Sequence, residues 1–341
     1  MCTAINFLNQ QHENVFGRTM DFHYILDPRL AAFPAGSAWE STLGRELTDR
    51  YAVAGISRHF KNLYVLFDGV NEKGLAGGAL YFKGYADFPP FSQQSGKAQV
   101  PALDFLHYVL GLCASLDDLR ELLADITLVG LQDKLTGTVA PLHWIFTDLS
   151  GKSLVVEQTR QGLNAYENPV GVLTNSPDFP WQMTNLRSYI GAAPEQAEQA
   201  DWGGFRMEPF GQAAGTSVLP GGYTPPARFV RTAFQKLHMV QPETMQEAIV
   251  EGFHILEGVT LPNGVVKTAN GTFDYTQYTS MIDLPSMVYY FKTYENPQII
   301  QVDLKPVWAS GEQAVWDLGS IQIPVFYGTL HQPTAGHRGI K

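Results

Sequence analysis

The chain begins MCTAINFLNQQHENVFGRTMDF, residues 1–22. Two β-rich stretches, 2–8 and 14–22, flank a polar turn around NQQHEN, and this pattern predicts two strands joined by that turn. A cysteine, Cys2, occupies the first position of the first strand. The opening of the chain therefore places a possible nucleophile at the end of a predicted strand pair.

Further along the chain, blocks of strand-like sequence are separated from blocks with helical periodicity. We expect helices at 102–113, from Ser115, at 224–238 and at 242–257, and a loop at 84–100. We expect strands at 51–57, 63–68, 75–82 and 170–177 and hairpins at 143–159 and 276–303, with the last strands running to about Leu330. Strands segregated from helices predict an α+β layered protein. Residues 192–223 are rich in Gly, Ala and Pro and lack periodicity, so they are interpreted as a long excursion with a functional or assembly role.

The composition describes a folded, acidic chain. Its 341 residues are 45% hydrophobic and 16% charged, with a formal net charge of −10. A negative surface repels phosphate backbones, so we expect no nucleic-acid partner. The sequence has no apolar run of about 18 residues, so we expect no membrane span. No basic segment followed by an apolar one opens the chain, so we expect a cytoplasmic protein.

Cys2 is a candidate nucleophile because of its position. A small residue there permits removal of Met1, which exposes a thiol and a free α-amine on one residue. An α-amine titrates near ~7.7 and a thiol near ~8.5, so the amine can accept the thiol proton at neutral pH without a histidine. The alternative is that position 2 is small for processing reasons alone.

Arg18 and Asp21 close the second predicted strand in GRTMDF. An arginine near a thiol favours the thiolate, and an aspartate near an α-amine can orient it. The alternative is a salt bridge at a strand end. A spacing of three puts the two side chains on opposite faces of a regular strand, so we expect both to face one site only if the chain bends here.

Asn175 in LTNSP and Arg228 in the predicted helix after TPPA are further polar candidates. An amide at a strand-to-turn junction can stabilise an oxyanion, although asparagine also favours turns for its own sake. Arg228 shares a helix face with Arg231, three residues on, and a solvated helix charge is its alternative. Sequence spacing alone cannot bring Asn175 and Arg228 to Cys2.

Other catalytic and metal-binding patterns are missing from the sequence. It has no HExxH, CxxC, G-x-S-x-G or Walker A motif, so we expect no metal and no organic cofactor. His143, His238 and His254 each lie beside apolar residues, where a core or surface role is favoured. Cys113, in LGLCASL, is expected to be a small buried residue.

Seven segments, in this order, give the chain a resemblance to a known family. They are MCTAINF, FGRTMDF, DGVNEKGL, VVEQT, LTNSPDFPWQ, TPPARFVRTAF and TQYTSMID. Together they resemble the choloylglycine hydrolase family, whose members include penicillin V acylases and conjugated bile salt hydrolases. The resemblance runs from residue 2 to about residue 303, most of the chain.

The resemblance implies a four-layer αββα sandwich of the N-terminal-nucleophile hydrolase type. Two central antiparallel sheets would lie between helix layers, in a single domain spanning 2–341. Many members of the family form homotetramers in which an extended loop contributes to assembly. We therefore expect a homotetramer, with 192–223 as the candidate assembly loop.

The resemblance also implies site roles. Cys2 maps onto the family's nucleophile. Arg18 would favour the thiolate, Asp21 would orient the amine, and Arg228 would polarise the site. The Asn175 side chain and the Tyr81 backbone N–H would form the oxyanion hole. Met20, Phe22 and Tyr24 are expected to line an apolar acyl pocket, with ordinary core packing as their alternative.

The expected activity is hydrolysis of a small-molecule linear amide. Penicillin V acylases of this family typically carry Tyr at the position of Tyr81, and bile salt hydrolases typically carry Asn. The sequence prediction therefore favours penicillin V acylase, with Tyr81 as an aromatic wall for a phenoxyacetyl group. The alternatives are a conjugated bile salt hydrolase, an acyl-homoserine lactone acylase, and a ligand-binding relative with a silent site.

Overall fold

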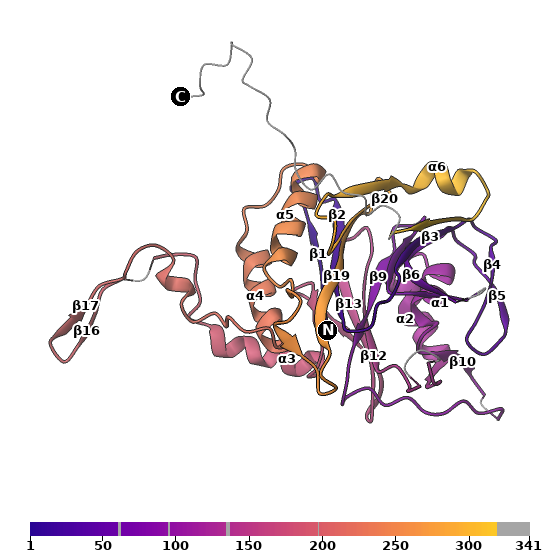
Figure 1. Cartoon of the computed structure of the whole chain (residues 1–341), viewed down its shortest axis with the longest axis horizontal. Coiled ribbons are helices and arrows are strands. Elements are labelled where there is room, and N and C mark those ends of the chain that lie inside the picture. Colours follow the sequence, from indigo (N-terminus) through magenta and orange to yellow (C-terminus); the bar gives the residue numbers. More distant parts are fainter. Residues whose placement is uncertain (61–62, 95, 134–136, 197, 319–341) are drawn as a thin grey trace, which may run out of the picture.

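The computed structural model describes residues 1–60, 63–94, 96–133, 137–196 and 198–318. In these residues, two antiparallel sheets pack against each other and helices cover the outer face of each (Figure 1). This is the arrangement of layers that the predicted αββα sandwich requires.

The first sheet is centred on the two strands that the opening sequence predicts. Its order is β15–β1–β2–β19–β20–β21, with β18 beside β19. The strands are β1 (Cys2–Leu8), β2 (Asn14–Phe22), β15 (Val172–Leu173), β18 (Val266–Lys267), β19 (Phe273–Asp283), β20 (Val288–Thr293) and β21 (Ile300–Asp303). β1 and β2 are buried on both faces, because helices cover one face and the second sheet covers the other.

The second sheet has the order β14–β13–β12–β9–β8–β6–β3–β22, with β7 beside β6. Its strands are β3 (Arg29–Phe33), β6 (Val53–Phe60), β7 (Leu63–Leu66), β8 (Asp68–Asn71), β9 (Ala76–Tyr81), β12 (Leu142–Thr147), β13 (Ser153–Thr159), β14 (Gly162–Glu167) and β22 (Ala314–Asp317). The predicted hairpin at 143–159 is the β12–β13 pair. β9 brings the end of the AGGALY segment close to β1.

Helices α4 (Pro225–His238) and α5 (Met245–Glu257) cover the first sheet, and α1 (Phe105–Leu112) and α2 (Leu116–Asp125) cover the second (Figure 1). The predicted N-caps are present: the Ser115 side chain accepts from Asp118 N, and the Thr224 side chain accepts from Ala227 N. α5 starts three residues later than predicted, because Thr244 forms a capping box that fixes its first turn.

Two apolar cores follow from the four layers. The larger core fills the space between the sheets and under α4 and α5, and contains Phe16, Tyr278 and Phe253. The smaller core lies between the second sheet and helices α1 and α2, and contains Phe105 and Trp144. The site described below lies at the edge of the larger core, where β1 begins.

The predicted excursion leaves the body of the molecule on the side of α4 (Figure 1). It follows α3 (Phe179–Asn185) and η1 (Leu186–Tyr189), and it contains the hairpin β16 (Ala200–Trp202) and β17 (Phe205–Met207) and the turn η2 (Ala214–Thr216). Trp202 is 75% exposed and Phe205 is 68% exposed.

Several predicted boundaries differ from the structure. The strand expected at 170–177 is reduced to Val172–Leu173, because the chain turns at Asn175 and at the proline that follows. The second arm of the 276–303 hairpin is split into β20 and β21 around Pro297, which has no N–H for a ladder. After β21 the chain forms α6 (Leu304–Ala309). Of the strands expected toward Leu330, β22 lies within the described residues, and the part after residue 318 lies outside them.

The remaining short strands pair outside the two main sheets. β4 (Ala38–Glu40) pairs with β5 (Glu46–Thr48), and β10 (Ala98–Pro101) runs parallel to β11 (Ile126–Val129). β10 begins inside the segment predicted as a loop at 84–100.

Candidate active site

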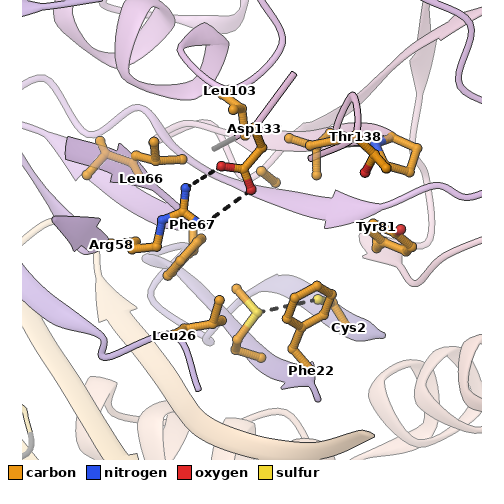
Figure 2. A pocket seen from close by; sticks show the side chains of 16 residues that line it. Cys2, Phe22, Leu26, Arg58, Leu66, Phe67, Tyr81, Leu103, Asp133 and Thr138 are labelled. Atoms are coloured by element: carbon orange, nitrogen blue, oxygen red, sulfur yellow. Dashed lines mark hydrogen bonds and ion pairs between the residues drawn. The ribbon is translucent and has the colours of Figure 1, made fainter. Parts of the chain in front are cut away.

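Cys2 stands directly opposite Met20 in the β1–β2 ladder. Opposite residues of antiparallel strands point to the same face, and Cys2 Sγ lies 3.9 Å from Met20 Sδ. That face looks toward the second sheet. The Cys2 side chain is buried there and lines a cavity (Figure 2).

The Arg18 guanidinium lies on the same face of the sheet as the thiol and is fully buried. Its Nη1 donates to the carbonyl oxygens of Phe67 at 2.6 Å and Ala79 at 2.9 Å, both in the second sheet region. Burial lowers the pKa of Arg18, but attraction to Cys2 and to other nearby acidic groups outweighs burial, so the pKa is raised. Arg18 is therefore a permanent positive charge on the thiol's face of the strand.

Asp21 lies on the opposite face of β2, toward α4. Its carboxylate accepts from Thr276 Oγ1 at 2.6 Å and from Thr19 Oγ1 at 3.2 Å, and it lies 4.0 Å from Arg228 Nη1. Burial raises the pKa of Asp21, and attraction to Arg228 opposes that rise. The carboxylate thus accepts from two hydroxyls and lies near the Arg228 cation.

No bend of β2 is needed to bring Arg18 and Asp21 to Cys2. The β1–β2 register runs without a shift from the Cys2–Met20 pair to the end of the ladder. The irregularity between the partners of Met20 and Asp21 is an extra residue in β19, Gln277, and not in β2. Arg18 lies on the side-chain face of Cys2, and Asp21 lies on the other face, near the backbone. Two residues on opposite faces of β2 therefore both lie close to the start of β1.

The backbone nitrogen of Cys2 donates to Asn175 Oδ1 at 2.9 Å. Met1 precedes it, and the Met1 ammonium contacts the carbonyl oxygen of Asp21, whose N–H donates to the Met1 carbonyl at 2.9 Å. Removal of Met1 turns the Cys2 nitrogen into an α-amine. In the present geometry that nitrogen lies against Asn175, while Asp21 contacts Met1.

Arg228 joins the residues on the helix side of Cys2. Its Nη1 donates to the Cys2 carbonyl at 2.5 Å and to Thr3 Oγ1 at 2.6 Å, and its Nη2 donates to Asn175 Oδ1 at 2.6 Å. Burial lowers the pKa of Arg228, with Asp21 the main opposing influence. The guanidinium therefore bridges the first strand and the Asn175 turn, which are far apart in sequence.

The orientation of the Asn175 amide follows from its partners. Oδ1 accepts from Cys2 N and from Arg228, so the NH2 group must point the other way. There, Nδ2 donates to the carbonyl oxygen of Tyr81 at 2.7 Å. An amide NH2 carries two hydrogens, so one of them is available to a second acceptor.

The Tyr81 N–H points to the same side as its carbonyl. Phe82 N donates to Pro141 O at 2.7 Å on the β12 side, whereas Ala79 N donates to Phe67 O at 2.8 Å on the opposite side. Backbone N–H groups alternate in direction along a strand, so the Tyr81 N–H points to the Phe67 side. This is also the side on which the asparagine amide reaches the Tyr81 carbonyl, so two donors converge beside Cys2.

The cavity that Cys2 lines is mainly apolar. Of the side chains predicted to form an acyl pocket, Met20, Phe22 and Tyr81 line it. Tyr24 is not among the lining residues; its ring lies 5.7 Å from that of Phe22, outside the cavity. The Phe22 and Tyr81 rings meet edge to face at 5.9 Å. The cavity wall is therefore aromatic next to the thiol.

A polar pair that the sequence did not predict lies in the same cavity. Arg58 Nη2 and Asp133 Oδ1 are 2.6 Å apart, across the cavity from Cys2 (Figure 2). The two residues are separated by many positions in sequence and lie outside the seven segments quoted above. No sequence signal identified them.

Most of the chain matches the model of one protein family. A model described as linear amide C–N hydrolases, choloylglycine hydrolase family, matches residues 2–308. The chain belongs to the choloylglycine hydrolase family. It is therefore a linear amide C–N hydrolase, and the predicted family and enzyme class are confirmed.

Curated relatives of this chain include two kinds of enzyme. A bile salt hydrolase/transferase from Clostridium perfringens is 36% identical over 307 residues, covering 89% of this chain and 92% of the relative. A bile salt hydrolase/transferase from Lactiplantibacillus plantarum is 31% identical, covering 89% and 92%. A penicillin V acylase from Pectobacterium atrosepticum is 26% identical, covering 96% and 88%.

Solved structures agree with the fold. A variant of the conjugated bile acid hydrolase from Clostridium perfringens has a TM-score of 0.87 at 33% identity, covering 93% of this chain and 97% of that chain. The penicillin V acylase from Agrobacterium tumefaciens has a TM-score of 0.75 at 23% identity, covering 94% and 93%. The predicted α+β sandwich of the N-terminal-nucleophile type is confirmed.

Several polar residues around the site of this hydrolase were not predicted individually. Thr276 and Tyr278 lie in TQYTSMID, and Asp68 lies in DGVNEKGL. Both segments carried the family resemblance without a role for any single residue. The signal that could have identified them is a polar side chain within a buried strand.

The described residues offer neither a metal site nor a membrane-spanning helix. Within them, no group of three or more His, Cys, Asp or Glu side chains could hold a metal ion. In the same part of the chain, no helix is both long enough and apolar enough to cross a membrane.

Proposed function

We propose that this enzyme cleaves the amide bond of bile salts conjugated to glycine or taurine, with Cys2 as its nucleophile. One observation carries the proposal: Cys2 lines an apolar cavity with its side chain and hydrogen-bonds to Asn175 through its backbone nitrogen. An apolar cavity suits a steroid acyl group. The bile salt hydrolase relatives are 36% and 31% identical to this chain, and the penicillin V acylase relative is 26% identical. The relatives therefore support a bile salt substrate more strongly than penicillin V.

The first step begins once Met1 has been removed. The Cys2 α-amine accepts the thiol proton, and the thiolate attacks the substrate carbonyl carbon. Arg18 favours the thiolate from the side-chain face. Asn175 Oδ1 orients the amine, and the amine then donates its proton to the leaving nitrogen of glycine or taurine. We assign a second orienting role to Asp21, whose carbonyl oxygen contacts the α-ammonium of Met1 while Met1 is present.

The negative charge that develops on the carbonyl oxygen needs donors fixed in advance. The second hydrogen of the Asn175 amide and the backbone N–H of Tyr81 are the donors that we assign to it. Arg228 polarises the asparagine through its bond to Oδ1. Attack leaves an acyl thioester on Cys2, which water hydrolyses.

A substrate amine that replaces this water would give acyl transfer in place of hydrolysis. Transfer is the second activity in the names of these two bile salt hydrolase relatives. The same donors and the same thioester serve both outcomes.

Penicillin V is the second candidate substrate, and Tyr81 is the observation that favours it. The sequence prediction ranked it first, because tyrosine is typical of the acylases at this position. The Tyr81 ring lines the cavity beside Phe22, where it can pack against a phenoxyacetyl group. The relatives favour the bile salt, so penicillin V takes second place.

Turnover of glycocholate and penicillin V at one enzyme concentration tests the proposal. We expect faster cleavage of glycocholate, none by Cys2→Ala, and an intact mass that lacks Met1. Active protein that keeps Met1, or a Cys2→Ala variant with the wild-type rate, would overturn the mechanism. Faster turnover of penicillin V would overturn the substrate. A thiol reagent that fails to modify Cys2, with ligand still bound, would indicate a silent binding relative.

We also propose that the chain is a single domain spanning 2–341. Its 200–207 hairpin joins copies of the chain in a homotetramer. The hairpin extends from the body (Figure 1). Its Trp202 and Phe205 side chains are exposed. Exposed aromatic side chains at such a tip are typical of an interaction site. Sedimentation of a Trp202→Ser, Phe205→Ser variant tests it: we expect smaller species, and an unchanged assembly contradicts the proposal.

A further inference from the structure

His143 is fully buried in β12 and has a partner at each ring nitrogen. Nδ1 lies 3.0 Å from Glu157 Oε1, and Nε2 lies 3.1 Å from the carbonyl oxygen of Thr174. The ring stacks on Phe82 at 4.2 Å with an interplanar angle of 6°. The sequence offered only a core or surface role for this histidine, but both of its polar atoms are used.

The Thr174 carbonyl determines where one hydrogen of the imidazole ring lies. A carbonyl oxygen can only accept, so Nε2 carries a hydrogen and donates it to Thr174. Glu157 orients the ring from the other side, and its carboxylate also accepts from Phe179 N at 3.1 and 3.2 Å. The pair His143–Glu157 therefore holds the turn between β15 and α3 at both of its ends.

This turn carries one half of the oxyanion hole assigned above. Thr174 directly precedes Asn175, whose amide is one of the two donors. Phe82 directly follows Tyr81, whose N–H is the other. One imidazole ring thus touches the chain neighbour of each donor, through a hydrogen bond on one side and through ring stacking on the other.

We propose that His143, held by Glu157, is a positioning residue that sets the separation of the Asn175 amide and the Tyr81 N–H. The proposal rests on the oxyanion hole of the proposed function. The donors of such a hole act only at about 2.7–3.1 Å from the oxygen, so a small displacement of the Asn175 turn weakens the transition state more than it weakens substrate binding.

The chain offers a matched control for a buried histidine. His107 in α1 is also buried, lies with Nε2 3.0 Å from Asp49 Oδ2, and stacks on Trp39 at 4.1 Å. Its ring lies 5.1 Å from that of Phe33 in the smaller core, whereas Cys2 belongs to the larger core. His143→Gln and His107→Gln therefore remove the same kind of histidine–carboxylate pair, and only the first touches the Asn175 turn.

The two variants are compared by steady-state kinetics and by alkylation of Cys2 with iodoacetamide. We expect His143→Gln to lower kcat roughly ten- to hundred-fold, with KM within about threefold of wild type. Alkylation develops no oxyanion, so its rate should stay within about threefold of wild type. We expect His107→Gln to keep kcat within about twofold while its thermal midpoint falls like that of His143→Gln.

A second pair of variants covers the case in which His143→Gln does not fold. The Glu157→Gln side chain can still accept from Phe179 N and can donate to Nδ1, so Nε2 keeps its bond to Thr174. The Glu157→Ala side chain can do neither. We expect Glu157→Gln to keep kcat within about fivefold and Glu157→Ala to lose about tenfold or more.

Three outcomes overturn the positioning role. One is a kcat for His143→Gln equal to that of His107→Gln, the second is alkylation that falls in parallel with kcat, and the third is equal kcat values for Glu157→Gln and Glu157→Ala. Asn175→Ala, measured beside them, separates the two proposals. If it keeps kcat, the oxyanion hole itself fails. If it abolishes kcat while His143→Gln matches His107→Gln, only the role of His143 fails.

Discussion

The carboxylate of Asp68 lies 3.8 Å from Nε of Arg18, and both side chains are fully buried. Arg18 belongs to the first sheet and Asp68 begins β8 in the second, so the pair crosses the interface between the sheets. Tyr278 OH donates to Asp68 Oδ2 at 2.6 Å, and Tyr289 OH donates to the other carboxylate oxygen. The positive charge of Arg18 is therefore paired with the Asp68 carboxylate of the second sheet, and two tyrosine hydroxyls hold that carboxylate in place.

This carboxylate should make stability depend on pH. Burial raises the pKa of Asp68 to about 6, against the attraction of Arg18. A carboxyl with a raised folded-state pKa binds its proton more tightly in the folded protein, so its contribution is present at low pH and is lost as pH rises from about 4 through about 6. Asp68→Asn removes this slope. We expect the unfolding free energy of Asp68→Asn, relative to that of wild type, to rise by about 2 kcal/mol as the pH increases through that window.

Urea denaturation at several pH values measures that shift. Asp117→Asn serves as the control, because the Asp117 side chain is 89% exposed, and we expect its unfolding free energy to follow wild type at every pH. Parallel curves for wild type and Asp68→Asn would contradict the raised pKa.

Arg228→Lys should separate charge from geometry at the helix side of the site. The guanidinium donates to Cys2 O, Thr3 Oγ1 and Asn175 Oδ1 at once, and an ammonium cannot reproduce this fork. We expect kcat to fall about a hundred-fold with a small change in KM. Arg231→Lys is the matched control on the same helix: Arg231 donates only to loop carbonyls, and its kcat should stay within about twofold. A similar kcat for both variants would contradict the bridging role.

Local signals predicted much of this fold. The polar turn after Leu8 predicted the β1–β2 pair, and Ser115 and Thr224 predicted the starts of two helices. These features depend on neighbouring residues, so short patterns contain them. The start of β20 follows a turn in which Met287 has a positive φ, and the start of α5 is fixed by the capping box of Thr244. The apolar pattern of the sequence does not resolve either feature.

The site depended on pairing over long distances, which no local pattern contains. Cys2 N meets Asn175 Oδ1 across 173 positions, and only the ordered family segments suggested that they meet. The face rule correctly put Arg18 and Asp21 on opposite sides of β2, but the sequence did not show that a strand end can be served from both sides. His143 was missed because its role runs through Thr174 and not through the substrate.

Tyr81→Asn should change substrate preference without removing the oxyanion donor. The backbone N–H remains, whereas the ring that meets Phe22 at 5.9 Å in the cavity wall is lost. An aromatic contact is worth about 1 kcal/mol beyond its buried area. We therefore expect the ratio of kcat/KM for penicillin V to that for glycocholate to fall roughly five- to tenfold. An unchanged ratio would mean that the Tyr81 ring does not touch the acyl group.

Gly17→Ala should test how closely β2 and β19 approach beside Arg18. A Cβ at Gly17 would overlap Met281 Sδ and lie 2.6 Å from the carbonyl oxygen of Ser280. That oxygen belongs to the backbone of β19 and cannot move aside, so we expect a loss of about 2–3 kcal/mol in unfolding free energy. Gly252→Ala meets only the flexible end of Met281 and gains up to about 1 kcal/mol of helix propensity in α5, so its loss should be smaller. Urea denaturation compares the two, and equal losses would mean that Met281, not the strand backbone, sets the penalty.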